Sequence, residues 1–137
     1  MRSIVILLFI GLLAFSFQGR FGRNLLRGPD LAIDHRAVSV LRGAITHVRD
    51  GDTFEVNGIP VRISALDCAE NSTAEGKKIT RFAKQFKGKE TICELTGAKT
   101  YDRVVGYCSI NGIDFGKMMM DETSCKLWAK YDIWNKY

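Results

Sequence analysis

The sequence predicts a mainly β domain with helices, of the α+β class, in which one helix lies between the third and fourth of five strands and a second helix follows the fifth strand. Short apolar runs separated by Asp-Gly and Asn-Gly turn signals predict the strands. A segment near the middle of the chain, with apolar residues at helical spacing, predicts the first helix. The chain has 137 residues, which corresponds to one small domain after an N-terminal segment.

The first three strands are expected between residues 43 and 66. The first covers about 43–48, and the second begins after the Asp50-Gly51 turn signal at Thr53. Asn57-Gly58 is the strongest hairpin signal in the chain and predicts a return strand over 59–66. In this strand Val61, Ile63 and Ala65 share one face, so Arg62 lies on the other face.

The first helix is expected to begin at Ser72, which can act as its N-cap, with Glu75 completing a capping box. Gly88 can end this helix. One side is apolar, and the other side is basic. The basic side is either an ordinary solvated helix face or a surface that approaches a phosphate backbone. Its residues are Lys77, Lys78, Arg81, Lys84 and Lys87.

The last two strands are predicted over 90–95 and 104–110, joined by a short connection at 96–103. If they form a hairpin, Cys93 and Cys108 face each other across it. Asp114 can cap a short second helix. With a helix between the third and fourth of five strands, this order is that of an OB-fold barrel. The aromatic end of the chain either covers the core or stacks on nucleic-acid bases; its residues are Trp128, Tyr131, Trp134 and Tyr137.

The N-terminus predicts export. A basic start and an apolar run over 4–17 are typical of a signal peptide over 1–16, and the alternative is an uncleaved membrane anchor, because arginines follow the run. We expect a linker over 17–41 and one domain over 42–137.

The four cysteines form no CxxC pair and no histidine lies near them, which argues against a zinc site. Behind an export signal they predict disulfides, for which we prefer Cys93–Cys108 with Cys68–Cys125; the alternative is four reduced thiols.

Charge and acid placement point to a polyanionic substrate. The net charge is +5, which suits nucleic acid, an anionic membrane or simple solubility. Asp52 lies at the start of the second strand, directly before Thr53, and Asp67 lies at the end of the third, directly after Leu66. Barrel curvature would be needed to bring these carboxylates together. With a backbone carbonyl and water they would form an oxygen site suited to Ca²⁺, or to Mg²⁺ with more water. Arg62 and Glu70 flank this site, and the alternative role for the acids is capping of turns and of the helix start.

The stretch from about Gly43 to Trp128 resembles the thermonuclease family, the staphylococcal-nuclease-like domain. The matching residues are Asp50-Gly51-Asp52-Thr53, Arg62 five residues before Asp67, Asp67-Cys68-Ala69-Glu70, and Tyr101-Asp102-Arg103. The resemblance implies that Asp52, Asp67 and the backbone carbonyl of Cys68 bind one Ca²⁺ ion, with Asp50 and Thr53 in support. It implies that Arg62 and Arg103 grip phosphate and that Glu70 acts on water.

The implied activity is an endonuclease on DNA and RNA with little base preference. We infer no protein partner and expect a monomer that is periplasmic or secreted, or tethered through residues 4–17. The alternative is an OB-fold module that binds nucleic acid without cutting it. Two positions depart from the family pattern, since Ala69 replaces a proline and Asp102 replaces a glycine. Asp102 could partly neutralise Arg103, and Cys68–Cys125 would tie the active-site loop to the chain after the second helix.

Overall fold

The computed structural model describes residues 32–137, so the predicted signal or anchor and most of the predicted linker lie outside the described residues. Five long strands and two helices make a mainly β structure of the α+β class, as predicted. The strands are β1 (Ser39–Asp50), β2 (Thr53–Val56), β3 (Ile59–Ile63), β5 (Glu90–Thr100) and β6 (Arg103–Ile110), and the helices are α1 (Ala74–Ala83) and α2 (Phe115–Glu122). Within residues 32–137 there are also three short strands and two 3-10 turns: β4 (Leu66–Asp67), β7 (Ile113–Asp114), β8 (Lys126–Leu127), η1 (Lys84–Phe86) and η2 (Ala129–Tyr131).

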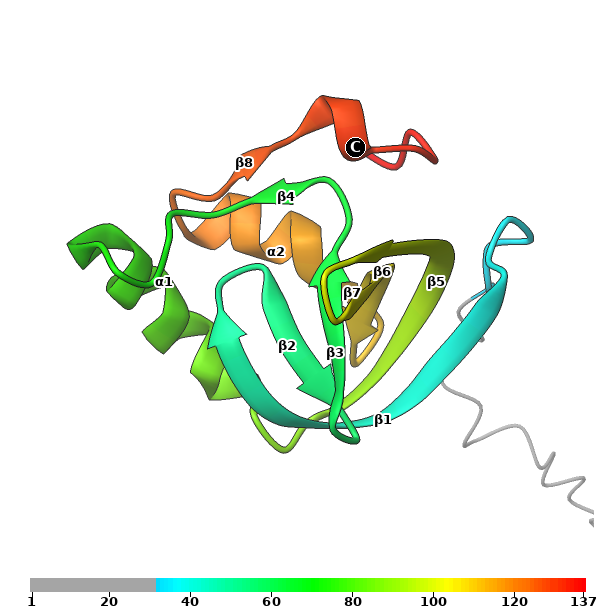
Figure 1. Cartoon of the computed structure of the whole chain (residues 1–137), viewed down its shortest axis with the longest axis horizontal. Coiled ribbons are helices and arrows are strands. Elements are labelled where there is room, and N and C mark those ends of the chain that lie inside the picture. The colour runs from blue at the N-terminus through cyan, green and yellow to red at the C-terminus, as the bar shows by residue number, and fades with distance from the viewer. Residues whose placement is uncertain (1–31) are drawn as a thin grey trace, which may run out of the picture. The chain divides into compact units, whose positions relative to one another are not determined.

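The five long strands close into a ring (Figure 1). Their order is β3-β2-β1-β5-β6, and a parallel pairing between β3 and β6 joins the two ends. In that pairing Val61 lies opposite Val104, and Ile63 lies opposite Gly106. Helix α1 connects β4 to β5 and packs against β1, whereas α2 packs against β6. The pairing of β3 with β6 therefore brings together segments that lie about forty positions apart in the sequence.

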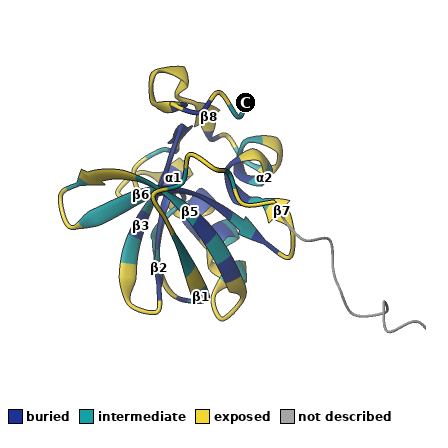
Figure 2. Ribbon diagram, turned by 90° about the vertical axis from the view of Figure 1, so that its right-hand side faces the viewer, coloured by how far each residue is buried: buried dark blue, intermediate teal, exposed yellow. Residues whose placement is uncertain are grey.

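The two predicted hairpins are confirmed. Asn57 and Gly58 both have left-handed backbone angles, φ 49° and 78°, which is the geometry of a tight two-residue turn. This turn sets the register of β2 with β3, in which Thr53 lies opposite Arg62. In the second hairpin Cys93 and Cys108 are direct partners. The exposed residues of the ring gather at such hairpin ends, whereas buried residues lie along the strands (Figure 2).

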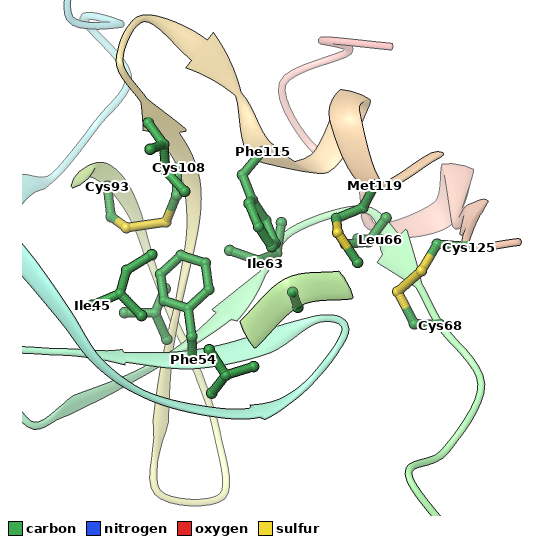
Figure 3. Close-up of a cluster of buried hydrophobic side chains, with 14 of the residues drawn as sticks. Ile45, Phe54, Ile63, Leu66, Cys68, Cys93, Cys108, Phe115, Met119 and Cys125 are labelled. Atoms are coloured by element: carbon green, nitrogen blue, oxygen red, sulfur yellow. A yellow bond between two sulfur atoms is a disulfide. The ribbon is translucent and has the colours of Figure 1, made fainter. Parts of the chain in front are cut away.

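The core lies inside the ring and is closed by α2 (Figure 3). Phe54 of β2 meets Phe115 of α2 edge to face, with ring centres 5.1 Å apart, and Ile45, Ile63 and Met119 surround this pair. Both preferred disulfides are present, so the pairings Cys93–Cys108 and Cys68–Cys125 are confirmed. The first bridges two ring strands. The second fastens the segment after β4 to the segment after α2.

Three local predictions were wrong. The N-cap of α1 is Thr73, whose hydroxyl accepts the Gly76 N–H, and Glu75 bonds Ser124 instead of closing a capping box with Ser72. The connection at 96–103 is no loop, because β5 and β6 continue to a two-residue turn. The return strand breaks after Ile63, and Ala65 takes a left-handed φ of 62° before the chain resumes as β4.

The first strand also begins earlier than predicted. Strand β1 starts at Ser39 and pairs with Leu95, so the last residues of the predicted linker belong to the sheet. Arg36 donates to the carbonyl oxygen of Trp134 at 2.8 Å, which attaches the preceding segment to the end of the chain. Among residues 32–137, no helix is long and apolar enough to cross a membrane.

The aromatic C-terminal segment serves two different roles. Trp134 is buried and stacks on Tyr107 of β6, with ring centres 4.8 Å apart. The Tyr107 hydroxyl donates to Asp132 at 2.8 Å, and the backbone N–H groups of 136 and 137 donate to the same carboxylate. The part of the segment around Trp134 therefore covers the core, which was one of the two predicted alternatives; the other was stacking on nucleic-acid bases. Trp128 and Tyr131 remain partly exposed.

Candidate functional site

A cavity of about 500 Å³ opens where β3, β4, the β5–β6 hairpin and the C-terminal segment meet. This volume falls within the range of small-ligand sites. Of the eight residues that the sequence nominated for a site, seven line this cavity, and Thr53 is buried directly behind it. The seven are Asp50, Asp52, Arg62, Asp67, Cys68, Glu70 and Arg103.

The register of the ring explains why the two arginines share this cavity. Arg62 of β3 lies opposite Thr53 of β2 on one side and opposite Val105 of β6 on the other side. Arg103 precedes Val105 by two positions, and side chains two positions apart on a strand point to the same face. The closure of the ring through β3 and β6 therefore places Arg62 and Arg103 on one face, although 41 positions separate them in the sequence.

Polar contacts connect both arginines to the Asp52-Thr53 pair. The Arg62 Nη2 atom lies 3.3 Å from Oδ2 of Asp52, and its Nη1 donates to the Ile63 carbonyl at 2.8 Å. The Thr53 hydroxyl donates to Oδ1 of Asp52 at 3.0 Å and accepts from Nη1 of Arg103 at 3.2 Å. The chain of contacts thus runs from Arg62 through Asp52 and Thr53 to Arg103. It orients both guanidinium groups and leaves further N–H donors on each for a ligand.

The acidic end of the cavity is built on the turn before β2. The Asp52 N–H donates to Oδ1 of Asp50 at 3.3 Å, and the Cys68 N–H approaches Oδ2 of Asp52 at 3.4 Å. A Cβ added to Gly51 would lie 2.3 Å from Cγ2 of Ile79, so only glycine lets this turn pack so closely on α1. Burial raises the pKa of the Asp52 carboxyl above its ordinary value, Arg62 opposes the rise, and Asp50 adds to it.

The other two predicted acids lie on the rim. Asp67 and Glu70 are exposed, and within residues 32–137 neither carboxylate has a hydrogen-bond or ion-pair partner. The backbone of Glu70 is nevertheless fixed, because its carbonyl accepts the N–H of Thr73 at 2.9 Å. A Cβ on Gly76 would lie 1.8 Å from the same carbonyl oxygen, so the first turn of α1 packs directly on Glu70. Both carboxylates are therefore free to meet a ligand or water in the cavity.

Sequence reasoning missed one contact beside the site. The guanidinium of Arg49 in β1 donates two hydrogen bonds to the carboxylate of Asp102 at the tip of the β5–β6 hairpin, from Nη1 at 3.1 Å and from Nη2 at 2.9 Å. Its Nε also donates to Oε1 of Glu55 at 3.1 Å. Bonding to Arg49 lowers the pKa of the Asp102 carboxyl. Asp102 thus has its own cationic partner next to Arg103. No sequence signal marks a pair whose members are 53 positions apart and meet only after the ring closes.

The C-terminal segment forms a further wall of the cavity. The Ser64 hydroxyl donates to the Tyr131 carbonyl at 2.8 Å, and the Trp128 N–H donates to the Ala65 carbonyl at 2.7 Å. These bonds hold the half-exposed rings of Trp128 and Tyr131 along the cavity. The two aromatic residues are evident in the sequence. The turn at Ala65, to which the Trp128 N–H is bonded, contains no glycine or proline, so no sequence signal predicts it.

The donor set fits a hard cation whose remaining ligands are water. Within the described part of the chain, no three side chains of His, Cys, Asp or Glu converge as a metal cluster. Asp52, Asp67 and Cys68 nevertheless all line one cavity, and carboxylates and backbone carbonyls are the oxygen ligands that a hard cation takes. Burial and the neighbouring Asp50 disfavour the charged form of Asp52, and a bound cation would favour it. A divalent cation beside Asp52 would thus favour the charged form of its carboxylate, as Arg62 does at 3.3 Å.

Comparison with known proteins adds no assignment. No model of a known protein family matches this chain, and a search of curated proteins gives no match.

Proposed function

We propose that this protein is an exported, Ca²⁺-dependent endonuclease of the thermonuclease type that hydrolyses the phosphodiester bonds of DNA and RNA with little base preference. One observation carries the proposal: two arginines linked through Asp52 and Thr53 share a cavity with two acids, Asp67 and Glu70, whose carboxylates have no partner among residues 32–137. The closed ring of five strands, with α1 between the third and the fourth, supports an OB-fold assignment.

The arginines supply a grip for one phosphate. A guanidinium donates paired N–H groups to phosphate oxygens and stabilises the charge that develops as phosphorus becomes five-coordinate. Arg62 is held by Asp52 and the Ile63 carbonyl, and Arg103 is held by Thr53. Both are thus oriented before a substrate binds, which reduces the cost of ordering them in the transition state.

Glu70 supplies the acid–base step. Its carboxylate is exposed at the rim and has no partner among residues 32–137, so it is free to accept a proton from an attacking water. The family resemblance assigns the same role to this residue. A Ca²⁺ ion held by Asp52, Asp67 and the Cys68 carbonyl would supply additional positive charge at the phosphate.

Export rests on the N-terminal sequence and on the two disulfides. Four cysteines paired in this way are typical of proteins that fold in an oxidising compartment. The apolar run over 4–17 would either be removed as a signal peptide or remain as a tether.

Cleavage of labelled single-stranded DNA with and without Ca²⁺ tests the proposal. We expect Arg62→Ala and Glu70→Ala each to lower kcat/KM by about 10² to 10³, because each removes one group that acts in the transition state. The matched control is Arg42→Ala, which should retain full activity, because Arg42 is exposed and its side chain has no hydrogen bond or ion pair among residues 32–137. Full activity of either site variant would contradict the assignment. Binding of DNA without any cleavage would instead favour the non-catalytic OB-fold module.

A further inference from the structure

The outer side of α1 and the segment after it carry an uninterrupted group of cations. Between positions 77 and 89 the sequence has six basic residues and no acidic residue. All six are exposed, and none of their side chains has a hydrogen-bond or ion-pair partner within residues 32–137. We call this surface the α1 basic face: Lys77, Lys78, Arg81, Lys84, Lys87 and Lys89.

In the rest of the described chain, basic residues are mixed with a larger number of acidic residues. Several of these basic residues are paired with carboxylates, and the remainder of residues 32–137 contains ten basic against fourteen acidic residues. The positive charge of the described domain is thus concentrated on one helix and the turn that follows it. A merely solubilising face normally mixes both signs, because like charges three or four positions apart destabilise a helix. The paired cations elsewhere include Arg36, Arg49, Arg62, Lys117 and Lys136.

The basic face begins beside the cavity. Lys77, Arg81 and Lys84 follow one another at spacings of four and three residues, which places them in one stripe about 10 Å long. The opposite side of α1 is buried through Ile79 and Ala83. The first turn of α1 packs on the backbone of Glu70, so the helix starts next to a rim residue of the cavity, and it lies outside the ring of strands (Figure 1).

We propose that the α1 basic face binds the phosphate backbone of a single nucleic-acid strand whose neighbouring segment occupies the cavity. This inference rests on the proposed function and extends it, because the substrate becomes a strand several nucleotides long instead of one phosphodiester. Contacts to phosphate carry no base specificity, in keeping with a substrate of any sequence.

The structure favours a nucleic acid over an anionic membrane as the partner. A helix that lies in a membrane interface needs an apolar face to insert. The apolar face of α1 is already used in the core, and Phe86 in the following turn packs edge to face on Phe115 at 5.8 Å. No large apolar side chain between 77 and 89 is among the exposed ones. The surface thus offers charge without an apolar anchor.

A salt titration of DNA binding tests this inference. The probes are fluorescently labelled oligothymidylates of about 4 and about 20 nucleotides, and binding to the full chain is measured in chelator at several salt concentrations. The test variant is Arg81→Gln/Lys84→Gln. The matched control is Arg42→Gln/Lys117→Gln, which removes one arginine and one lysine from other exposed positions.

Each phosphate contact to a single strand contributes about 0.7 to the slope of log K against log salt. The test variant should therefore lower the slope for the longer probe by about 1.4, equivalent to roughly 25-fold weaker binding at about 0.1 M salt. Binding of the short probe, and binding of both probes to the control variant, should not change.

Three results would overturn the inference: an unchanged slope in the test variant, an equal loss in the control, or binding to phosphatidylserine vesicles with none to the longer probe. The proposed function is tested separately by cleavage of the short probe in Ca²⁺, which the test variant should retain. If the wild-type chain cuts nothing but the salt slopes behave as expected, the proposed function fails and the binding surface stands.

Discussion

The disulfide between Cys68 and Cys125 should contribute strongly to both stability and activity. It joins the segment after β4 to the segment before β8, and these two strands share only two residue pairs, Leu66 with Leu127 and Asp67 with Lys126. Beyond β8 the chain forms the aromatic wall of the cavity. Removing the bridge therefore releases a wall of the site as well as a covalent constraint on the unfolded chain.

The size of the effect follows from the loop that the bond closes. The two cysteines are 57 positions apart, and the Cys93–Cys108 bond, with a separation of 15, lies inside that loop. With the inner bond intact, the effective loop is about 43 residues, for which loop-closure entropy gives about 4 kcal/mol. The same relation gives about 3 kcal/mol for the inner bond.

Urea denaturation of the Cys68→Ala/Cys125→Ala variant measures this contribution. We expect a loss of about 4 kcal/mol in the free energy of unfolding, together with reduced nuclease activity. Cys93→Ala/Cys108→Ala is the comparison, since it removes a bond between ring strands that does not reach the cavity. A loss below about 1 kcal/mol, or unchanged melting of the wild type in strong reductant, would refute the reasoning.

Three further predictions concern single contacts. Arg49→Gln should lower kcat/KM several-fold by leaving Asp102 unpaired beside Arg103, and adding Asp102→Asn should restore most of the loss; equal rates in all three proteins would contradict this role. Burial tends to raise the pKa of Asp132, but three donors outweigh it and hold the pKa below its ordinary value, so its ionised form stabilises the fold at neutral pH. The stability lost in Asp132→Asn should shrink as the pH falls from about 5 to about 2, which urea titrations at each pH would measure. Ca²⁺ should raise the melting temperature of the wild type but not of Asp52→Asn; an equal rise in both would exclude Asp52 as a ligand.

The hairpins and the strand face that carries Arg62 could be predicted because their signals are local. Asn57-Gly58 fixes a turn and the register of two strands, and strict alternation then assigns Arg62 to the face opposite Val61 and Ile63. Asp114 caps α2 as its sequence position indicates. Local chemistry decides each of these features before the chain is folded.

The remaining features depend on tertiary contacts. Ala65 has no intrinsic preference for a left-handed backbone, and the bend there leads the chain out of the ring to pair with β8. Ser72 and Thr73 are both good N-cap residues, so the sequence alone does not choose between them. In the structure the helix begins at Ala74 with Thr73 as its N-cap, and in this arrangement Gly76 packs on the Glu70 carbonyl. The fork from Arg49 to Asp102 likewise exists only in the closed ring.

The parallel join between β3 and β6 has a consequence for how the protein matures. The hairpins on either side can form early from neighbouring residues, but Arg62 and Arg103 come together only when this distant pairing is made. A newly made chain with both hairpins in place would therefore still be inert. On the function proposed above, catalytic competence would appear only with this late pairing, and a half-formed chain could not yet cut nucleic acid.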